Sequence, residues 1–259
     1  MRNNSTWAPS ALSPISWAPE AWNPWLTLFA IFGAIVAAFV PQLVYAIVAV
    51  SLNLIDVHHP NAVGPDQLLA LQAVTYIPLG IYLLIVLPVL AHSSLAALGL
   101  RWPSAGELLA GILGALAMTL AVDVAGAIME SLTHKVSPEA AITLLHEMKT
   151  PQEKIGFFLI ACLLAPMIEE LGFRVLLYNA LTRYIPIPAA IVVSGFVFGT
   201  VHMSPLSLDQ LLTVAIPLAC GGMVLAYVYA ATRCYWSNVT THALFNGISV
   251  AAVFLFHAK

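Results

Sequence analysis

The chain has 259 residues, of which 61% are hydrophobic and only 8% are charged, and its formal net charge is −3. A soluble domain usually carries about 25% charged residues, so a water-soluble core of this size could not bury the apolar excess. The small net charge also gives no basis for binding nucleic acid. In lipid, helices satisfy their own backbone groups, and the alternating pattern of a barrel strand is absent. The composition therefore predicts an all-α, polytopic integral membrane protein.

The amino-terminal half reads as a membrane scaffold. Residues 1–24 are predicted to form an interfacial segment, because they contain Trp7, Trp17 and Trp22 and tryptophan is enriched at membrane interfaces. Residues 25–135 follow as scaffold helices. Their apolar stretches of about 25–55, 68–91 and 108–129 are each long enough to cross a bilayer, which takes about 20 residues.

Residues 136–259 are predicted to hold the functional helices, within one membrane domain. A short amphipathic helix beginning near Ser137 is expected to lie at the membrane interface, with Leu145 and Met148 on its apolar stripe. Thr150 then begins a helix that runs to about residue 183 and should kink at Pro166. Further spans are expected at about 189–203, 208–231 and 239–256. The total is about seven transmembrane helices, within a range of 6–8.

Charged residues inside spans are costly, by about 2.5–3.5 kcal/mol each on insertion scales, and so mark functional candidates. The fourth span carries Glu169, Glu170 and Arg174 after 14 uncharged residues from Ile155. Glu170 and Arg174 are one helical turn apart and can pair, whereas Glu169 is rotated by about 100° and can face elsewhere. One carboxylate is therefore predicted to be neutralised and the other to be free.

Later spans bring two histidines and an asparagine. His202 follows Phe198 by one turn, and His242 and Asn246 are one turn apart on a shared face. Glu169 and His202 both lie roughly 21 Å from the turn at residues 184–188, at 1.5 Å per residue, and should be level in an antiparallel hairpin. Helix tilt can bring Asn246 to a similar depth. The sequence therefore predicts one polar pocket built from three helices.

These side chains are suited to activating water against an amide carbonyl. A glutamate can act as a general base, and two imidazoles with an amide can either hold a metal ion such as zinc, with His202 and His242 as ligands, or donate hydrogen bonds to an oxyanion. Taken singly, each has a simpler explanation, since Glu170 with Arg174 can be a structural ion pair and a lone histidine can join two helices. Their coincidence at compatible depth favours a site.

The three motifs resemble those of the CPBP family of intramembrane proteases, named for CAAX prenyl proteases and bacteriocin-processing enzymes and also called the Abi family. Glu169, Glu170 and Arg174 match its first motif, Phe198 and His202 its second, and His242 and Asn246 its third. Many members have glycine after the arginine, where this chain has Val175, a departure that concerns local packing.

The resemblance implies a glutamate-dependent endopeptidase in which Glu169 and His202 activate water and His242 with Asn246 stabilise the oxyanion. Glu170 and Arg174 would orient the site or contact the substrate. A metallo-endopeptidase with zinc stays an alternative to metal-free catalysis. The implied partners are membrane lipids and a peptide or lipidated protein, and the implied location is an inner or plasma membrane, or the endoplasmic reticulum in a eukaryote.

Two other function classes remain open. A non-catalytic membrane scaffold or immunity protein could use the same fold to bind a partner. An ion- or proton-coupled transporter also needs buried carboxylates and histidines, although no paired half-chains with matching broken helices are visible. The sequence indicates neither the substrate nor the oligomeric state.

Overall fold

The computed structural model describes residues 17–55, 63–135, 144–145, 147–203 and 207–256, with the side chains of residues 254 and 256 not described. All regular structure in these ranges is helical. The first three helices are α1 (Pro24–Ser51), α2 (Pro65–Ala91) and α3 (Ala105–Thr133). Each begins where the sequence offers a start signal, such as the capping box in which Ser104 and Glu107 bond to each other's backbone at the start of α3.

The fourth predicted span is one continuous helical segment with two changes of hydrogen-bond register. It consists of α5 (Pro151–Leu159), a π-helical turn (Ile160–Leu164), α6 (Ala165–Glu170), a second π-helical segment (Leu171–Tyr178) and α7 (Asn179–Thr182). Thr150 and Glu153 form the predicted capping box at its start. The expected break at Pro166 takes the form of the π-helical turn directly before it.

The remaining predicted spans also recur as helices. They are α8 (Ile187–Thr200), the segment formed by α9 (Leu208–Gln210), a π-helical turn (Leu211–Ala215) and α10 (Ile216–Thr232), and finally α11 (Tyr235–Phe256). The predicted amphipathic helix falls largely outside the described residues. Its described members Leu144, Leu145 and Met148 are buried.

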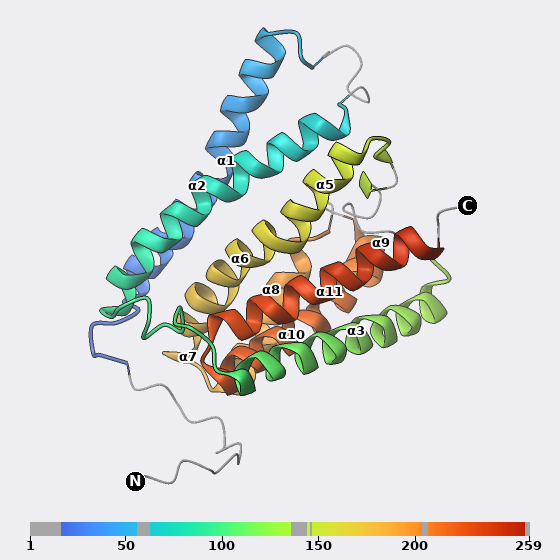
Figure 1. The fold of residues 1–259 in the computed structure, drawn as a ribbon. Helices are drawn as coiled ribbons and strands as arrows, with labels where there is room; N and C mark the ends of the chain where they lie inside the picture. Colours follow the sequence, from blue (N-terminus) through green and yellow to red (C-terminus); the bar gives the residue numbers. More distant parts are fainter. Residues whose placement is uncertain (1–16, 56–62, 136–143, 146, 204–206, 257–259) are drawn as a thin grey trace.

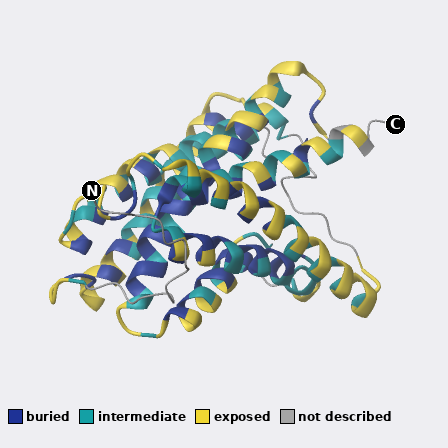
Figure 2. Ribbon diagram, turned by 60° about the horizontal axis from the view of Figure 1, so that its bottom comes forward, coloured by how far each residue is buried: buried dark blue, intermediate teal, exposed yellow. Residues whose placement is uncertain are grey.

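The helices form a bundle in which α1 packs on α2, while α10 lies against both α8 and α3, and α11 against α3 (Figure 1). Buried residues gather between the helices and exposed residues cover their outer faces (Figure 2). Many of the exposed residues are large and apolar, as on α1, where Phe29, Phe32 and Phe39 are each more than 60% exposed. Such a surface suits lipid, not water.

Five of the described helical segments are long and apolar enough to cross a membrane, namely 24–51, 65–91, 105–133, 151–182 and 208–232. The all-α polytopic fold is thus confirmed. The helix α8 is apolar but has 14 residues, and α11 is not among the five, so the count of seven spans stays a prediction.

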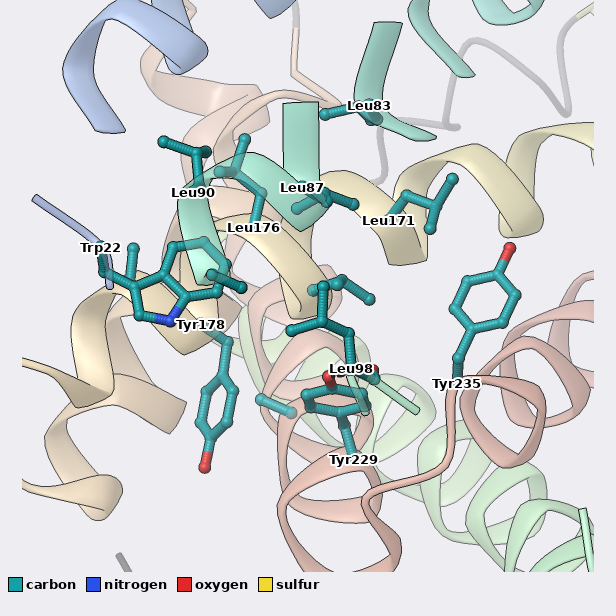
Figure 3. Packing of buried hydrophobic residues seen from close by; sticks show 14 of the residues in the cluster. Trp22, Leu83, Leu87, Leu90, Leu98, Leu171, Leu176, Tyr178, Tyr229 and Tyr235 are labelled. Carbon is teal, nitrogen blue, oxygen red and sulfur yellow. Dashed lines mark hydrogen bonds between the residues drawn. The ribbon is translucent and has the colours of Figure 1, made fainter. Parts of the chain in front are cut away.

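The main core lies where α2, the second π-helical segment and α10 meet (Figure 3). Leu83 and Leu87 of α2 pack there with Tyr178 and Tyr229, whose rings meet edge to face at 5.3–5.8 Å distances typical of such pairs, here 5.8 Å. Trp22 is fully buried in the same cluster, so this tryptophan packs against protein and does not face the membrane interface as predicted. The cluster holds α2 against the helix that carries the two glutamates.

Close helix packing sets the position of α8. A Cβ atom at Gly199 would lie 2.1 Å from the carbonyl oxygen of Ala215, and one at Gly222 would lie 2.9 Å from the backbone of Gly195. Both positions need glycine because the neighbouring atoms belong to backbone that cannot rotate away. The glycines therefore allow α8 and α10 to touch along their backbones, which brings Phe198 and the following turn toward the fourth segment.

Candidate active site

A cavity of about 250 Å³ lies among α2, the segment 151–170, α8, α10 and α11. Its polar lining comes from Gln72, Tyr76, Glu169, His202, His242 and Asn246, and its apolar lining from Phe157, Ala161, Ala165, Phe198, Val201, Leu218 and Phe245. The structure thus brings together the four residues predicted to be catalytic. His202 lies two residues past the end of α8, in a turn, and not within the span as predicted.

Glu169 lies between the two imidazoles. Its Oε2 atom is 3.8 Å from His202 Nε2 and 3.8 Å from His242 Nε2, and its side chain is 14% exposed. The predicted match in depth between Glu169 and His202 therefore holds. Both separations are too long for a direct hydrogen bond, but one water molecule can bridge atoms at this distance.

The tautomers of both rings follow from their Nδ1 partners. His202 Nδ1 lies 2.7 Å from the carbonyl oxygen of Phe198, and His242 Nδ1 lies 2.8 Å from Glu170 Oε1. Each of these oxygens can only accept, so each Nδ1 carries a proton. A neutral His202 therefore presents the lone pair of Nε2 to the cavity, as does a neutral His242.

Glu170 lies on the other side of the helix and is fully buried. Its Oε2 lies 3.2 Å from Nε of Arg174, and both side chains have 0% exposure. Asn238 of α11 donates an amide hydrogen bond to the same oxygen. The predicted ion pair is therefore present, and because neither partner is exposed, it can orient His242 but cannot contact a substrate in this conformation.

Phe198 connects the ion pair to the histidines. The guanidinium of Arg174 lies over its ring, 4.7 Å from the centroid, and donates to the carbonyl oxygen of Gly222 at 3.0 Å. The ring of Phe198 also contacts both imidazoles, with centroid distances of 4.6 Å to His202 and 5.5 Å to His242. Phe198 therefore acts on the site through its ring as well as through its carbonyl group.

Asn246 bonds to a backbone carbonyl that the helix leaves without a donor. In the π-helical turn, the N–H of Ala165 bonds to the carbonyl of Ile160, five residues back. The next donor in that register would be residue 166, which is proline and has no N–H. Asn246 Nδ2 instead donates to that carbonyl, on Ala161, at 2.7 Å. The amide is thereby oriented beside the cavity, with a second N–H remaining.

Two contributors were missed in the sequence. Tyr76 of α2 donates to Glu169 Oε1 at 2.6 Å, although α2 was assigned to the scaffold. Asn238 precedes His242 by four residues, as His242 precedes Asn246, so this polar stripe on an otherwise apolar helix was a readable signal. No comparable signal marked Tyr76. The division of the chain at residue 135 stays a prediction.

Zinc would need a set of donors close enough to share one ion. Within the described ranges, no three histidine, cysteine, aspartate or glutamate side chains meet that condition. His202 and His242 are both turned toward Glu169, but as placed here they do not form such a set with it. The expectation of zinc therefore stays a prediction, and no chemical step below depends on a metal.

Val175 occupies the position where the resemblance leads one to expect glycine. It is fully buried in the main core, so the packing here accepts the larger side chain.

Comparison with known proteins agrees with these motifs. Residues 151–248 match the family model described as "Type II CAAX prenyl endopeptidase Rce1-like". No curated protein and no solved structure matches the chain. The matched segment contains all seven predicted site residues, whereas Tyr76 lies outside it. The recognition made from three short motifs is therefore confirmed: residues 151–248 of this integral membrane protein are a segment of the Rce1-like, CAAX-protease type.

Proposed function

We propose that the protein is an intramembrane endopeptidase that hydrolyses a peptide bond in a membrane-associated or lipidated substrate, with Glu169 as the general base. The observation that carries this proposal is the placement of one glutamate oxygen at 3.8 Å from the Nε2 atoms of His202 and His242, beside a cavity. The family match at residues 151–248 supports the same class of reaction.

A water molecule bridging Glu169 and His202 is the nucleophile. It donates one hydrogen to Oε2 of Glu169 and the other to Nε2 of His202, which leaves an oxygen lone pair to attack the carbonyl carbon. Glu169 takes the first proton as the carbon–oxygen bond forms. When the tetrahedral intermediate collapses, the carbon–nitrogen bond breaks and Glu169 gives this proton to the leaving amine. The second proton leaves as the product carboxyl group ionises.

His242 and Asn246 stabilise the oxyanion. Asn246 uses one amide hydrogen on Ala161, which turns the other toward the cavity. His242 donates Nδ1–H to Glu170, and when Nε2 also carries a proton, that second N–H points to the cavity side. Donors held in place before the reaction stabilise developing negative charge without reorganising, which is why their fixed partners matter.

The test compares two substrates and two pairs of matched variants. Purified protein in liposomes is incubated with a farnesylated peptide ending in cysteine, two aliphatic residues and methionine, or with the same peptide lacking the lipid, and products are identified by mass spectrometry. Glu169→Gln should lower turnover by about 10²- to 10⁴-fold, the usual contribution of a general base. Glu130→Gln is the control because Glu130 is exposed on α3.

The histidine pair is designed in the same way. His202→Asn should also abolish cleavage, whereas His92→Asn changes an exposed histidine at the end of α2 and should not. Full turnover by folded Glu169→Gln or His202→Asn protein would overturn the proposal. The scaffold and transporter alternatives predict no cleavage by the wild type, and the transporter further predicts ion flux in the liposomes that Glu169→Gln removes.

A further inference from the structure

The phenol of Tyr76 is the one contact from the amino-terminal helices to the glutamate among the hydrogen bonds of the described residues. Its hydroxyl group donates to Glu169 Oε1 at 2.6 Å, across 93 positions of sequence. Both side chains line the same cavity. The two oxygens of Glu169 are therefore in different environments, because Oε1 accepts from a phenol and Oε2 faces two imidazoles.

The packing of α2 fixes where Tyr76 can reach. Gly80, one turn after Tyr76, lies against Ile168, whose Cδ1 atom would be 2.4 Å from a Cβ at Gly80. This contact brings α2 close to α6 one residue before Glu169. Further along α2, Leu83 and Leu87 are fully buried against the helix that carries the glutamate (Figure 3). Tyr76 is thus presented by a packed helix and not by a loop.

The other side of α2 is tied to α1. Gln42 donates its amide to the hydroxyl of Thr75 at 2.7 Å, and that hydroxyl donates to the carbonyl of Leu71. Thr75 directly precedes Tyr76, so the backbone at this point is held from both faces. The result is a rigid support for the phenol.

The chemistry of a carboxylate explains why this support matters. The terminal torsion of glutamate has a broad, roughly two-fold preference, so a carboxylate without a partner samples many orientations. A hydroxyl donating to an ionised carboxylate forms a short, charge-assisted hydrogen bond, and 2.6 Å lies in the range for that class. Holding Oε1 fixes the plane of the carboxylate and hence the position of Oε2.

We propose that Tyr76 is a positioning residue that holds Oε1 of Glu169, so that Oε2 alone acts as the base toward the bridging water. This inference rests on the proposed function of Glu169. It also assigns a role in the reaction to α2, which lies outside the segment matched by the family. Tyr76 does not exchange a proton with the substrate in this mechanism.

Tyr82 provides a matched control on the same helix. Its hydroxyl donates to the carbonyl of Ala30 at 3.1 Å and is also partly buried, but it lies away from the cavity. Tyr76→Phe and Tyr82→Phe each remove one oxygen atom and one hydrogen bond from α2. Their stabilities can therefore be compared directly, while only Tyr76→Phe touches the glutamate.

The experiment measures kcat, KM and thermal stability for both variants in liposomes, with the peptide that the wild type cleaves. Tyr76→Phe should lower kcat by about 10- to 100-fold, the scale of a misplaced reacting group, with KM and stability unchanged relative to Tyr82→Phe. Tyr82→Phe should retain the wild-type kcat. The binding of a peptide with a reduced, non-hydrolysable bond should be equal in all three proteins.

Two results would overturn the inference. One is a Tyr76→Phe protein with the kcat of Tyr82→Phe. The other is a Tyr76→Phe protein that loses stability, peptide binding and kcat together, since that pattern means a structural role. The Glu169→Gln variant separates these results from failure of the proposed function: if it remains active, the base assignment fails, whereas an inactive Glu169→Gln beside a fully active Tyr76→Phe refutes only the role of Tyr76.

Discussion

Replacing Arg174 with methionine removes the cation of an ion pair that is completely buried. Methionine keeps most of the apolar stem but leaves the carboxylate of Glu170 without the guanidinium 3.2 Å away, and it also removes the donor to Gly222. Breaking a buried pair by removing one partner costs about 3–5 kcal/mol, because the remaining charge stays desolvated. The contact of Arg174 with the ring of Phe198 places the expected loss toward the upper end of that range.

A double variant tests whether the uncompensated charge is the cause. Glu170→Gln combined with Arg174→Met leaves no buried charge, so the double variant should be more stable than Arg174→Met alone. The coupling between the two positions should reach the upper part of the range of about 0.5–3 kcal/mol found for neighbouring groups. The glutamine offers one acceptor to both Asn238 and His242, so stability should not return fully to that of the wild type.

The assay is unfolding by sodium dodecyl sulfate in mixed micelles, followed by circular dichroism, which requires no substrate. Arg183→Met is the matched control, because the exposed guanidinium of Arg183 donates only to the carbonyl of Pro19 and its loss should change the free energy of unfolding by about 0.5 kcal/mol or less. A loss below about 1 kcal/mol for Arg174→Met, the value of a surface pair, would refute this reasoning. Strict additivity in the double variant would refute it as well.

Two further predictions concern packing and metal. Gly199→Ala should lower stability by about 1–3 kcal/mol or more in the same assay, because its Cβ would meet the carbonyl oxygen of Ala215, whereas Gly126→Ala, with nothing within 4 Å, should not lower it. Equal stability of the two variants would contradict the close approach of α8 and α10. Purified protein should contain less than one zinc ion per chain by mass spectrometry and should keep its peptidase activity after chelation; stoichiometric zinc, lost together with activity and restored with it, would contradict this expectation.

The meeting of Glu169 and His202 could be predicted because both side chains are counted from one turn. In an antiparallel hairpin, equal numbers of residues give equal depth, and the two functional atoms lie 3.8 Å apart. The pairing of Glu170 with Arg174 was also predictable, since it depends only on a spacing of four along one helix. Both successes rest on local geometry.

The missed features depend on packing between distant segments. A tyrosine in an apolar helix is unremarkable in composition, so nothing in the sequence of α2 distinguishes Tyr76 from Tyr82. Pro166 marked a break in the fourth helix, but a proline alone does not tell whether a helix bends or changes register. The π-helical turn before it, and the carbonyl of Ala161 that Asn246 fills, become visible only once α11 is placed alongside.

Consecutive glutamates can serve two different purposes because successive residues of a helix point about 100° apart. Glu170 points into the protein, where Arg174 neutralises it, and Glu169 points to the cavity, where its Oε2 has no neighbouring cation of this kind. His242 joins the two sides, since Nδ1 contacts Glu170 and Nε2 faces Glu169. The buried ion pair therefore determines the orientation of a ring in the cavity, and a change at Arg174 should affect turnover through His242 even where the fold survives.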